Sequence, residues 1–290
     1  MPLTDPGGGL PLGVTVLVLF AAMLHAGWNA GVKIGSDRLV VLALMNGVGA
    51  SLAVLLLPLV PLPELPSWPY ILASVILHSG YYFFLIQQYR VGDLSHVYPL
   101  ARGLSPLLIA SGGALIASEV FPAPAVFGLL LACAGIMSLA FESGLPWRRD
   151  SRPLLFAIGT ACFIAAYTLV DGTGVRLAGA PLAYIVWLFF LDGIPILCFA
   201  LLRRRREIIT VLGREWRKSL AGGGMQSGAY GIVIWAMGQG PMAQVSALRE
   251  TSVVFAVLIG VLVLREKFGA YRLVASVLVA SGLFLLNYFA

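Results

Sequence analysis

The chain repeats its own pattern of residues 147 positions apart, and this repeat constrains its fold more than any other feature. Residues 96–140 align with residues 243–287 without gaps. Identical pairs include Arg102 with Arg249, Ser105 with Ser252, Gly113 with Gly260, Leu115 with Leu262, Glu119 with Glu266, Phe121 with Phe268, Gly135 with Gly282 and Leu139 with Leu286. The repeat indicates a fold made of two similar units.

Each unit consists of long apolar segments. Hydrophobic residues make up 59% of the chain and charged residues only 11%, whereas soluble domains carry about 25% charged residues. About 20 consecutive apolar residues span the hydrocarbon of a bilayer. We predict ten such segments, at residues 12–33, 37–60, 68–90, 93–117, 123–142, 153–173, 180–202, 219–238, 242–264 and 270–289. They leave no room for a soluble catalytic domain.

The segments divide equally between the two halves of the chain. We expect a first repeat at residues 1–142, a linker at residues 143–152 and a second repeat at residues 153–290. Because each repeat holds an odd number of segments, the second repeat lies in the membrane in the opposite orientation to the first. The predicted fold is an all-α membrane protein with ten transmembrane helices in two inverted five-helix repeats. Transporters with this architecture place their site between the repeats.

Positive charge lies almost entirely on one side of the predicted segments. The chain has 19 Lys and Arg, and all but three lie on, or beside, the loops after the first, third, fifth, seventh and ninth segments. Arg102 and Arg249 lie inside segments, and only Arg176 lies on the other side. An excess of Lys and Arg marks the cytoplasmic face. We therefore expect a bacterial-type inner (plasma) membrane protein with both termini periplasmic or extracellular, and no nucleic acid as a partner.

The connection at residues 203–218 combines cationic residues with apolar residues at helical spacing. Ile208, Ile209, Leu212 and Trp216 recur between arginines, which is typical of an amphipathic helix on anionic lipid. The charges are explained by membrane orientation alone, and a regulatory role is the alternative.

Segment 68–90 carries three polar groups that share one helical face. His78, Tyr81 and Tyr82 are spaced at i, i+3 and i+4, so their side chains point the same way. Their apolar bodies and polar tips suit an amphipathic organic solute. His78 is also able to exchange a proton near neutral pH; the alternative is that it only hydrogen-bonds a neighbouring helix.

Segment 93–117 places Tyr98, Arg102 and Ser105 on one face. We expect Pro99 and Pro106 to interrupt this segment, because each removes a backbone donor and leaves a carbonyl without its helical partner. Broken helices near the middle of the membrane are where transporters present backbone to a ligand.

Two arginines and two acidic residues inside the segments are candidates for function, because charge inside a bilayer is costly without a partner or a wet cavity. Arg102 is suited to bind a carboxylate or phosphate, or else pairs with an acidic residue such as Glu250 or Asp192. Arg249 and Glu250 are adjacent and point about 100° apart on a helix, so they need not pair with each other. Glu250 is either a proton carrier or a static lock between the repeats.

The other segments add polar faces to the predicted site. Asp192 lies centrally in its segment and joins His78 and Glu250 as a candidate for proton coupling, whereas Asp171 lies near a segment end and is expected at the solvated interface. The predicted substrate-binding residues are His78, Tyr81, Tyr82, Tyr98, Arg102, Gln226, Tyr230, Trp235, Arg249, Trp28 and Asn29.

The sequence lacks the motifs that several kinds of binding site and enzyme require. Cys133, Cys162 and Cys198 have neither metal-ligand nor disulfide spacing, and no phosphate-binding loop or dinucleotide fingerprint occurs. We predict no metal and no cofactor. An intramembrane enzyme would need a nucleophile–base pair or paired carboxylates on neighbouring faces, and only scattered single groups are found. Aromatic residues disfavour a passive channel, because they would plug a continuous pore.

Three short stretches carry a family resemblance: HAGWNA at residues 25–30, YPLARG at residues 98–103 and ALRE at residues 247–250. With ten predicted spans in two repeats, the whole chain resembles the EamA-like family of the drug/metabolite transporter superfamily. The resemblance implies a secondary transporter, not an enzyme, that exports small organic metabolites such as amino acids by alternating access. Its partners would be a small-molecule solute and the lipid bilayer, and a monomer is compatible with it. An importer of a vitamin, sugar or other small metabolite is the alternative.

Overall fold

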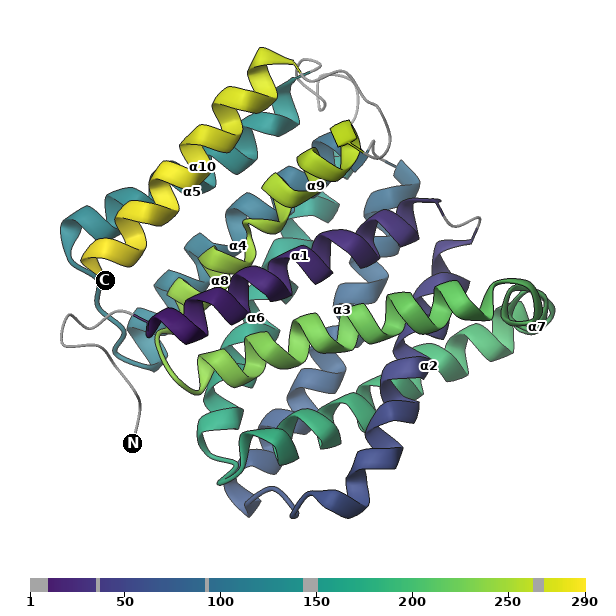
Figure 1. The fold of residues 1–290 in the computed structure, drawn as a ribbon. Helices are drawn as coiled ribbons and strands as arrows, with labels where there is room; N and C mark the ends of the chain where they lie inside the picture. Colours follow the sequence, from purple (N-terminus) through teal and green to yellow (C-terminus); the bar gives the residue numbers. More distant parts are fainter. Residues whose placement is uncertain (1–9, 35–36, 92–93, 143–150, 263–268) are drawn as a thin grey trace.

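The computed structural model describes residues 10–34, 37–91, 94–142, 151–262 and 269–290, and within these ranges every regular element is a helix (Figure 1). Most of the expected linker at residues 143–152, and the loop that holds Arg265 and Glu266, lie outside them. The helices are α1 (Leu12–Ile34), α2 (Arg38–Leu56), α3 (Trp68–Val91), α4 (Leu94–Ile116), α5 (Ala123–Ser138), α6 (Arg152–Arg176), α7 (Pro181–Met237), α8 (Met242–Arg249), α9 (Ser252–Leu262) and α10 (Ala270–Phe289), with three short 3₁₀ turns, Leu57–Leu59, Leu65–Ser67 and Leu139–Phe141.

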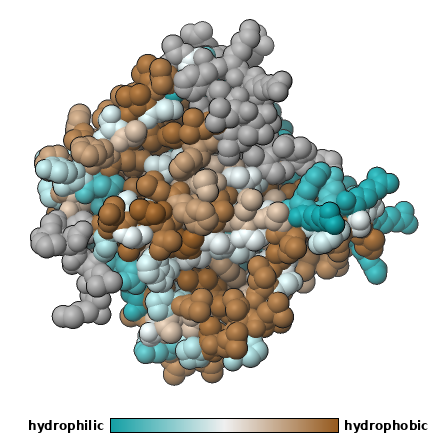
Figure 2. All heavy atoms as spheres, viewed as in Figure 1, coloured by the Kyte–Doolittle hydropathy of each residue, from teal (hydrophilic) through white to brown (hydrophobic). Residues whose placement is uncertain are grey.

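Eight of the described helices are long and apolar enough to cross a membrane. Large apolar side chains cover most of the visible surface, and hydrophilic residues gather at the end of the molecule where α7 turns (Figure 2). A helix bonds its own backbone groups, so it can face hydrocarbon without unsatisfied amides. The all-helical prediction is confirmed.

Two predicted segments and their connection lie within the single element α7. Its backbone leaves helical geometry at Arg204 and Glu215, where the chain reverses direction (Figure 1). The stretch between these two points remains helical, with Ile208 buried and Leu212 half exposed. This agrees with an amphipathic helix at the membrane surface.

The prediction that Pro99 and Pro106 interrupt their segment was wrong, because α4 runs continuously through both. Pro106 has no N–H to donate to the carbonyl of Arg102, four residues earlier. The Ser105 hydroxyl donates to that carbonyl oxygen at 3.3 Å. A side chain thus replaces the missing backbone bond, which is how membrane helices tolerate proline.

The break lies instead in the matching segment of the second half, which was predicted as one span at residues 242–264. α8 ends at Arg249 and α9 begins at Ser252. The Thr251 amide bonds to the carbonyl of Leu248, three residues back, at 3.1 Å, so the last turn of α8 tightens and the helix ends. No proline is needed for this break.

The two halves pack closely against each other. α2 lies along α7, α3 along α6 and α5 along α10. A Cβ atom added at Gly128 would lie 2.6 Å from the carbonyl oxygen of Gly282, and one added at Gly135 would lie 3.1 Å from that of Ala275. By the 147-residue offset, Gly128 corresponds to Ala275 and Gly135 corresponds to Gly282. The two contacts are therefore equivalent, and α5 and α10 touch through matching positions of the repeat.

Candidate functional site

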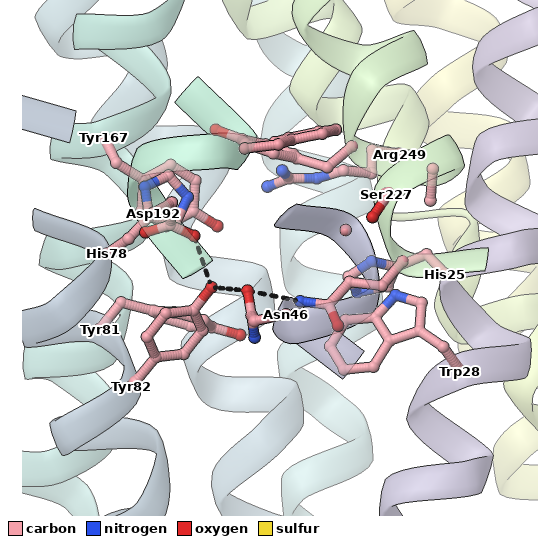
Figure 3. A pocket seen from close by; sticks show the side chains of 15 residues that line it. His25, Trp28, Asn46, His78, Tyr81, Tyr82, Tyr167, Asp192, Ser227 and Arg249 are labelled. Atoms are coloured by element: carbon pink, nitrogen blue, oxygen red, sulfur yellow. Dashed lines mark hydrogen bonds between the residues drawn. The ribbon is translucent and has the colours of Figure 1, made fainter. Parts of the chain in front are cut away.

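A small cavity lies in the middle of the molecule, where α1, α2, α3, α6, α7 and α8 meet (Figure 3). Its volume is about 70 Å³, well below the roughly 300–1,000 Å³ of most ligand sites. The lining residues are His25, Trp28, Asn46, Gly49, His78, Tyr81, Tyr82, Tyr167, Phe189, Asp192, Gln226, Ser227, Ala229, Tyr230 and Arg249. We call it the central pocket.

The structure brings together most of the predicted site residues. The predicted residues that line the central pocket are Trp28, His78, Tyr81, Tyr82, Asp192, Gln226, Tyr230 and Arg249. Those that do not line it are Asn29, Tyr98, Arg102, Trp235 and Glu250. Asn29 donates from its amide to the carbonyl of His25 in its own helix, at 2.8 Å.

Tyr82 connects three helices at one wall of the pocket. Its hydroxyl lies 2.7 Å from Oδ1 of Asn46 on α2 and 2.9 Å from Oδ2 of Asp192 on α7 (Figure 3). Gln226, on the second arm of α7, donates to the same Asn46 oxygen at 3.4 Å. Asn46 was missed by the sequence analysis, although an amide within the apolar segment 37–60 was a usable signal.

Glu250 joins the two halves through a buried ion pair. Arg102 Nε lies 2.6 Å from Glu250 Oε2, and Arg249 Nη2 lies 3.6 Å from Glu250 Oε1, with side-chain exposures of 1–4%. The lock interpretation of Glu250 and the pairing interpretation of Arg102 therefore agree with the structure. Arg249 and Glu250 also pair with each other, although they are neighbours at the end of α8.

Asp171 was expected at the solvated interface, and this was wrong. Its side chain is fully buried and accepts hydrogen bonds from the hydroxyls of Tyr184, at 2.9 Å, and Tyr230. α6 continues to Arg176, beyond the predicted segment end at residue 173, and the first turn of α7 covers the carboxylate. The acid therefore belongs to the packed interior.

The hydrogen bonds of His78 lie within its own helix, and its ring packs against a neighbouring one. Its Nδ1 lies 3.0 Å from the carbonyl oxygen and 3.1 Å from the hydroxyl of Ser74. The ring stacks on Tyr167 with centroids 4.1 Å apart. These contacts fix the imidazole at the pocket wall.

Four polar groups of the pocket lack a hydrogen-bond partner among the described residues. They are Nε of Arg249, Oδ1 of Asp192, the indole Nε1 of Trp28 and Oε1 of Gln226. Buried polar atoms are nearly always paired, and each exception needs an explanation. A cation, an anion, a donor and an acceptor that all line one cavity indicate a site for a polar ligand.

Comparison with known proteins supports a transporter. Residues 151–288 match the model of the EamA-like transporter family. These residues are an EamA-like transporter domain. The chain is therefore a multi-pass membrane protein, and the family to which this domain belongs moves small solutes across membranes.

The fold of the chain is shared with solved structures. One, titled only "Crystal structure of protein", aligns with 96% of this chain and 96% of its own, with a TM-score of 0.76 and 17% identity. At this identity the likeness shows the fold alone. No curated protein matches the chain.

A larger cavity reaches the central pocket from the arginine-rich end of the molecule. It has a volume of about 980 Å³ and lies between α2, α3 and α7. Arg38, Arg90 and Arg204 line it, and Tyr82 belongs to the walls of both cavities. We call it the vestibule.

The opposite end of the molecule is closed by a clamp around Arg176, at the end of α6. Its guanidinium bonds to Glu119 at 3.0 Å and to the carbonyls of Met237 and Gly240 at 3.0 and 2.7 Å. Glu119 also accepts the Met242 amide at 2.9 Å. The first arm of α7 begins next to this clamp and ends at the vestibule, so the two features lie at opposite ends of a membrane-spanning helix.

Proposed function

We propose that the protein is a secondary transporter that exports zwitterionic organic solutes of the amino-acid class by alternating access. The observation that carries this proposal is the pair of opposite charges with open bonding positions in one pocket. Arg249 is 2% exposed and Asp192 is 7% exposed, and both line the central pocket without full hydrogen bonding.

The chemistry of these groups fits an α-amino acid. The guanidinium of Arg249 offers two N–H donors to a carboxylate, and bonds between charged groups are roughly twice as strong as neutral ones. The free oxygen of Asp192 accepts from an ammonium group. The Trp28 N–H and the Gln226 carbonyl supply a further donor and acceptor. A solute with only one charge would leave the other buried group unpaired, at the cost of its desolvation.

The positions of the vestibule and the Arg176 clamp support alternating access. The vestibule extends to Tyr82, while the clamp closes the other end. The matching α5–α10 contacts support two inverted five-helix repeats at residues 1–142 and 153–290. The arginines that line the vestibule support a cytoplasmic position for this end of the molecule in an inner membrane, with both termini on the other side.

Asp192 is the strongest candidate for coupling to protons. Glu250 is neutralised by two arginines and His78 is bound to Ser74. Asp192 lines the central pocket with a carboxylate oxygen, Oδ1, that accepts no hydrogen bond from the described residues, whereas Glu250 does not line this pocket. Binding of the ammonium group and binding of a proton would therefore compete for the same carboxylate.

Counterflow in proteoliposomes tests the proposed function. Vesicles loaded with L-alanine should take up labelled L-alanine, while propionate and ethylamine, which each lack one charged group, should compete at least tenfold more weakly. Arg249→Gln and Asp192→Asn should abolish counterflow. Arg217→Gln, on the exposed connection, is the matched control and should be active. Equal competition by propionate, or counterflow of a sugar in place of alanine, would overturn the zwitterion proposal, and chemical change of the solute would indicate an enzyme.

A further inference from the structure

An apolar cavity lies beside the central pocket and opens on the outer face of the molecule, where its lining residues Leu17, Leu52 and Leu182 are 40–55% exposed. It has a volume of about 420 Å³ and is lined by α1, α2 and both arms of α7. Its walls are almost entirely hydrocarbon, including Leu52, Ile185, Ile232 and Trp235. We call it the side cavity.

The partition between the side cavity and the central pocket is thin. Gly49, Phe189 and Ser227 line both. Gly49 and Ser227 lie against each other, since a Cβ atom added at Gly49 would lie 2.5 Å from the Ser227 hydroxyl oxygen. The ring of Phe189 completes the partition and stacks on Tyr230 with centroids 6.3 Å apart. Among the described residues, only these three separate the two spaces, and rotation of the Phe189 ring would open the part that it closes.

We propose that the side cavity receives the apolar side chain of the solute whose charged groups bind Arg249 and Asp192. This inference rests on the proposed function and adds a preference for amino acids with large apolar side chains. The central pocket, at about 70 Å³, holds little more than the charged part of such a solute. The side cavity is the adjoining space of matching polarity, and burial of apolar surface there favours binding.

The site also explains the position of Trp235. The sequence placed this residue in the substrate site, and the structure places it in the side cavity rather than in the central pocket. An aromatic side chain at this position offers a large contact area to an aliphatic or aromatic group. Trp235 is therefore a residue that contacts the solute side chain.

Gly231 provides a way to fill the side cavity. A Cβ atom added there would lie 3.5 Å from Cγ2 of Ile185 and 3.7 Å from Cε2 of Phe189, which is ordinary packing distance. The two methyl groups of Gly231→Val would then occupy space within the cavity. Gly224, on the same arm of α7, has no atom within 4 Å of an added Cβ among the described residues and does not line the cavity. Gly224→Val is the matched control.

The test compares counterflow of L-phenylalanine and L-alanine in the wild type and in both glycine variants. Gly231→Val should lower the phenylalanine-to-alanine ratio of apparent affinities by roughly tenfold or more, the scale on which hydrophobic pockets discriminate. Gly224→Val should keep the wild-type ratio. Trp235→Ala, which enlarges the cavity, should lower the same ratio through lost contact and serves where Gly231→Val fails to fold.

The outcomes separate this inference from the proposed function. Alanine counterflow with an unchanged ratio in both Gly231→Val and Trp235→Ala would overturn the side-chain site and leave the zwitterion site standing. An equal loss for both amino acids would indicate that the cavity holds a lipid chain or only supports packing, which also overturns the inference. Absence of counterflow for every amino acid would overturn the proposed function and, with it, the inference.

Discussion

Removing the charge of Glu250 should destabilise the protein strongly. Glu250→Gln would leave two buried guanidinium groups, those of Arg102 and Arg249, without a counter-charge. Both side chains are 3–4% exposed, so water cannot replace the lost partner. Breaking a buried ion pair costs about 3–5 kcal/mol. With a shift of roughly 2–4 °C per kcal/mol, the melting temperature should fall by about 6–20 °C.

The assay is thermal unfolding of the detergent-solubilised protein, followed by tryptophan fluorescence. Glu207→Gln is the control, because its pair with Arg204 is 3.4 Å long and about half exposed, and such pairs contribute at most about 1 kcal/mol. Arg102→Met combined with Glu250→Gln should destabilise less than the sum of the single changes, since it removes one of the unpaired charges. A melting temperature for Glu250→Gln within 2 °C of the wild type would refute this reasoning.

Three further predictions follow from the site and its two ends. Tyr82→Phe removes the hydroxyl that links α2, α3 and α7 and should lower the free energy of unfolding by about 1–3 kcal/mol; an unchanged melting temperature would contradict the proposed network. Glu119→Gln should weaken the Arg176 clamp, so that a membrane-impermeant thiol reagent added outside labels Ser227→Cys several-fold faster, in a background without the native cysteines. Unchanged labelling would mean that the clamp does not limit access. A reporter active only in the cytoplasm should be silent after Ala290 and active near Gly213, and the reverse would overturn the orientation.

The sequence predicted the positions of the helices well, because the apolar segments are separated by glycine, proline and charged residues. The ends of α3 and α10 lie within one residue of the predicted segments. The breaks were not predictable in the same way. Proline marks a missing donor, yet the Ser105 hydroxyl compensates for it in α4. α8 ends where the backbone amide of Thr251 bonds to a carbonyl three residues back instead of four. No residue type in the sequence indicates this change.

Helical faces identified part of the site and missed the rest for a reason of geometry. Spacing on a single helix shows which side chains point the same way, so His78 and Tyr82 were found together. It does not show which faces of different helices meet. Tyr98 and Arg102 share a face but do not line the central pocket, while Asn46 lines it from a helix that showed no polar stripe. Asp171 was misplaced because the start of α7 covers it, which depends on packing between helices.

The break between α8 and α9 makes the two halves differ, and the proposed alternating access would exchange this difference between them. Thr251 corresponds to Leu104 by the 147-residue offset, and Leu104 lies in the unbroken α4. In a transporter built from inverted repeats, the opposite state is reached when each half adopts the conformation of the other. α4 would then break beside Gly103, while α8 and α9 would form one continuous helix. Pro106 has already removed the backbone bond that spans this point, so α4 would need to give up fewer hydrogen bonds to open there.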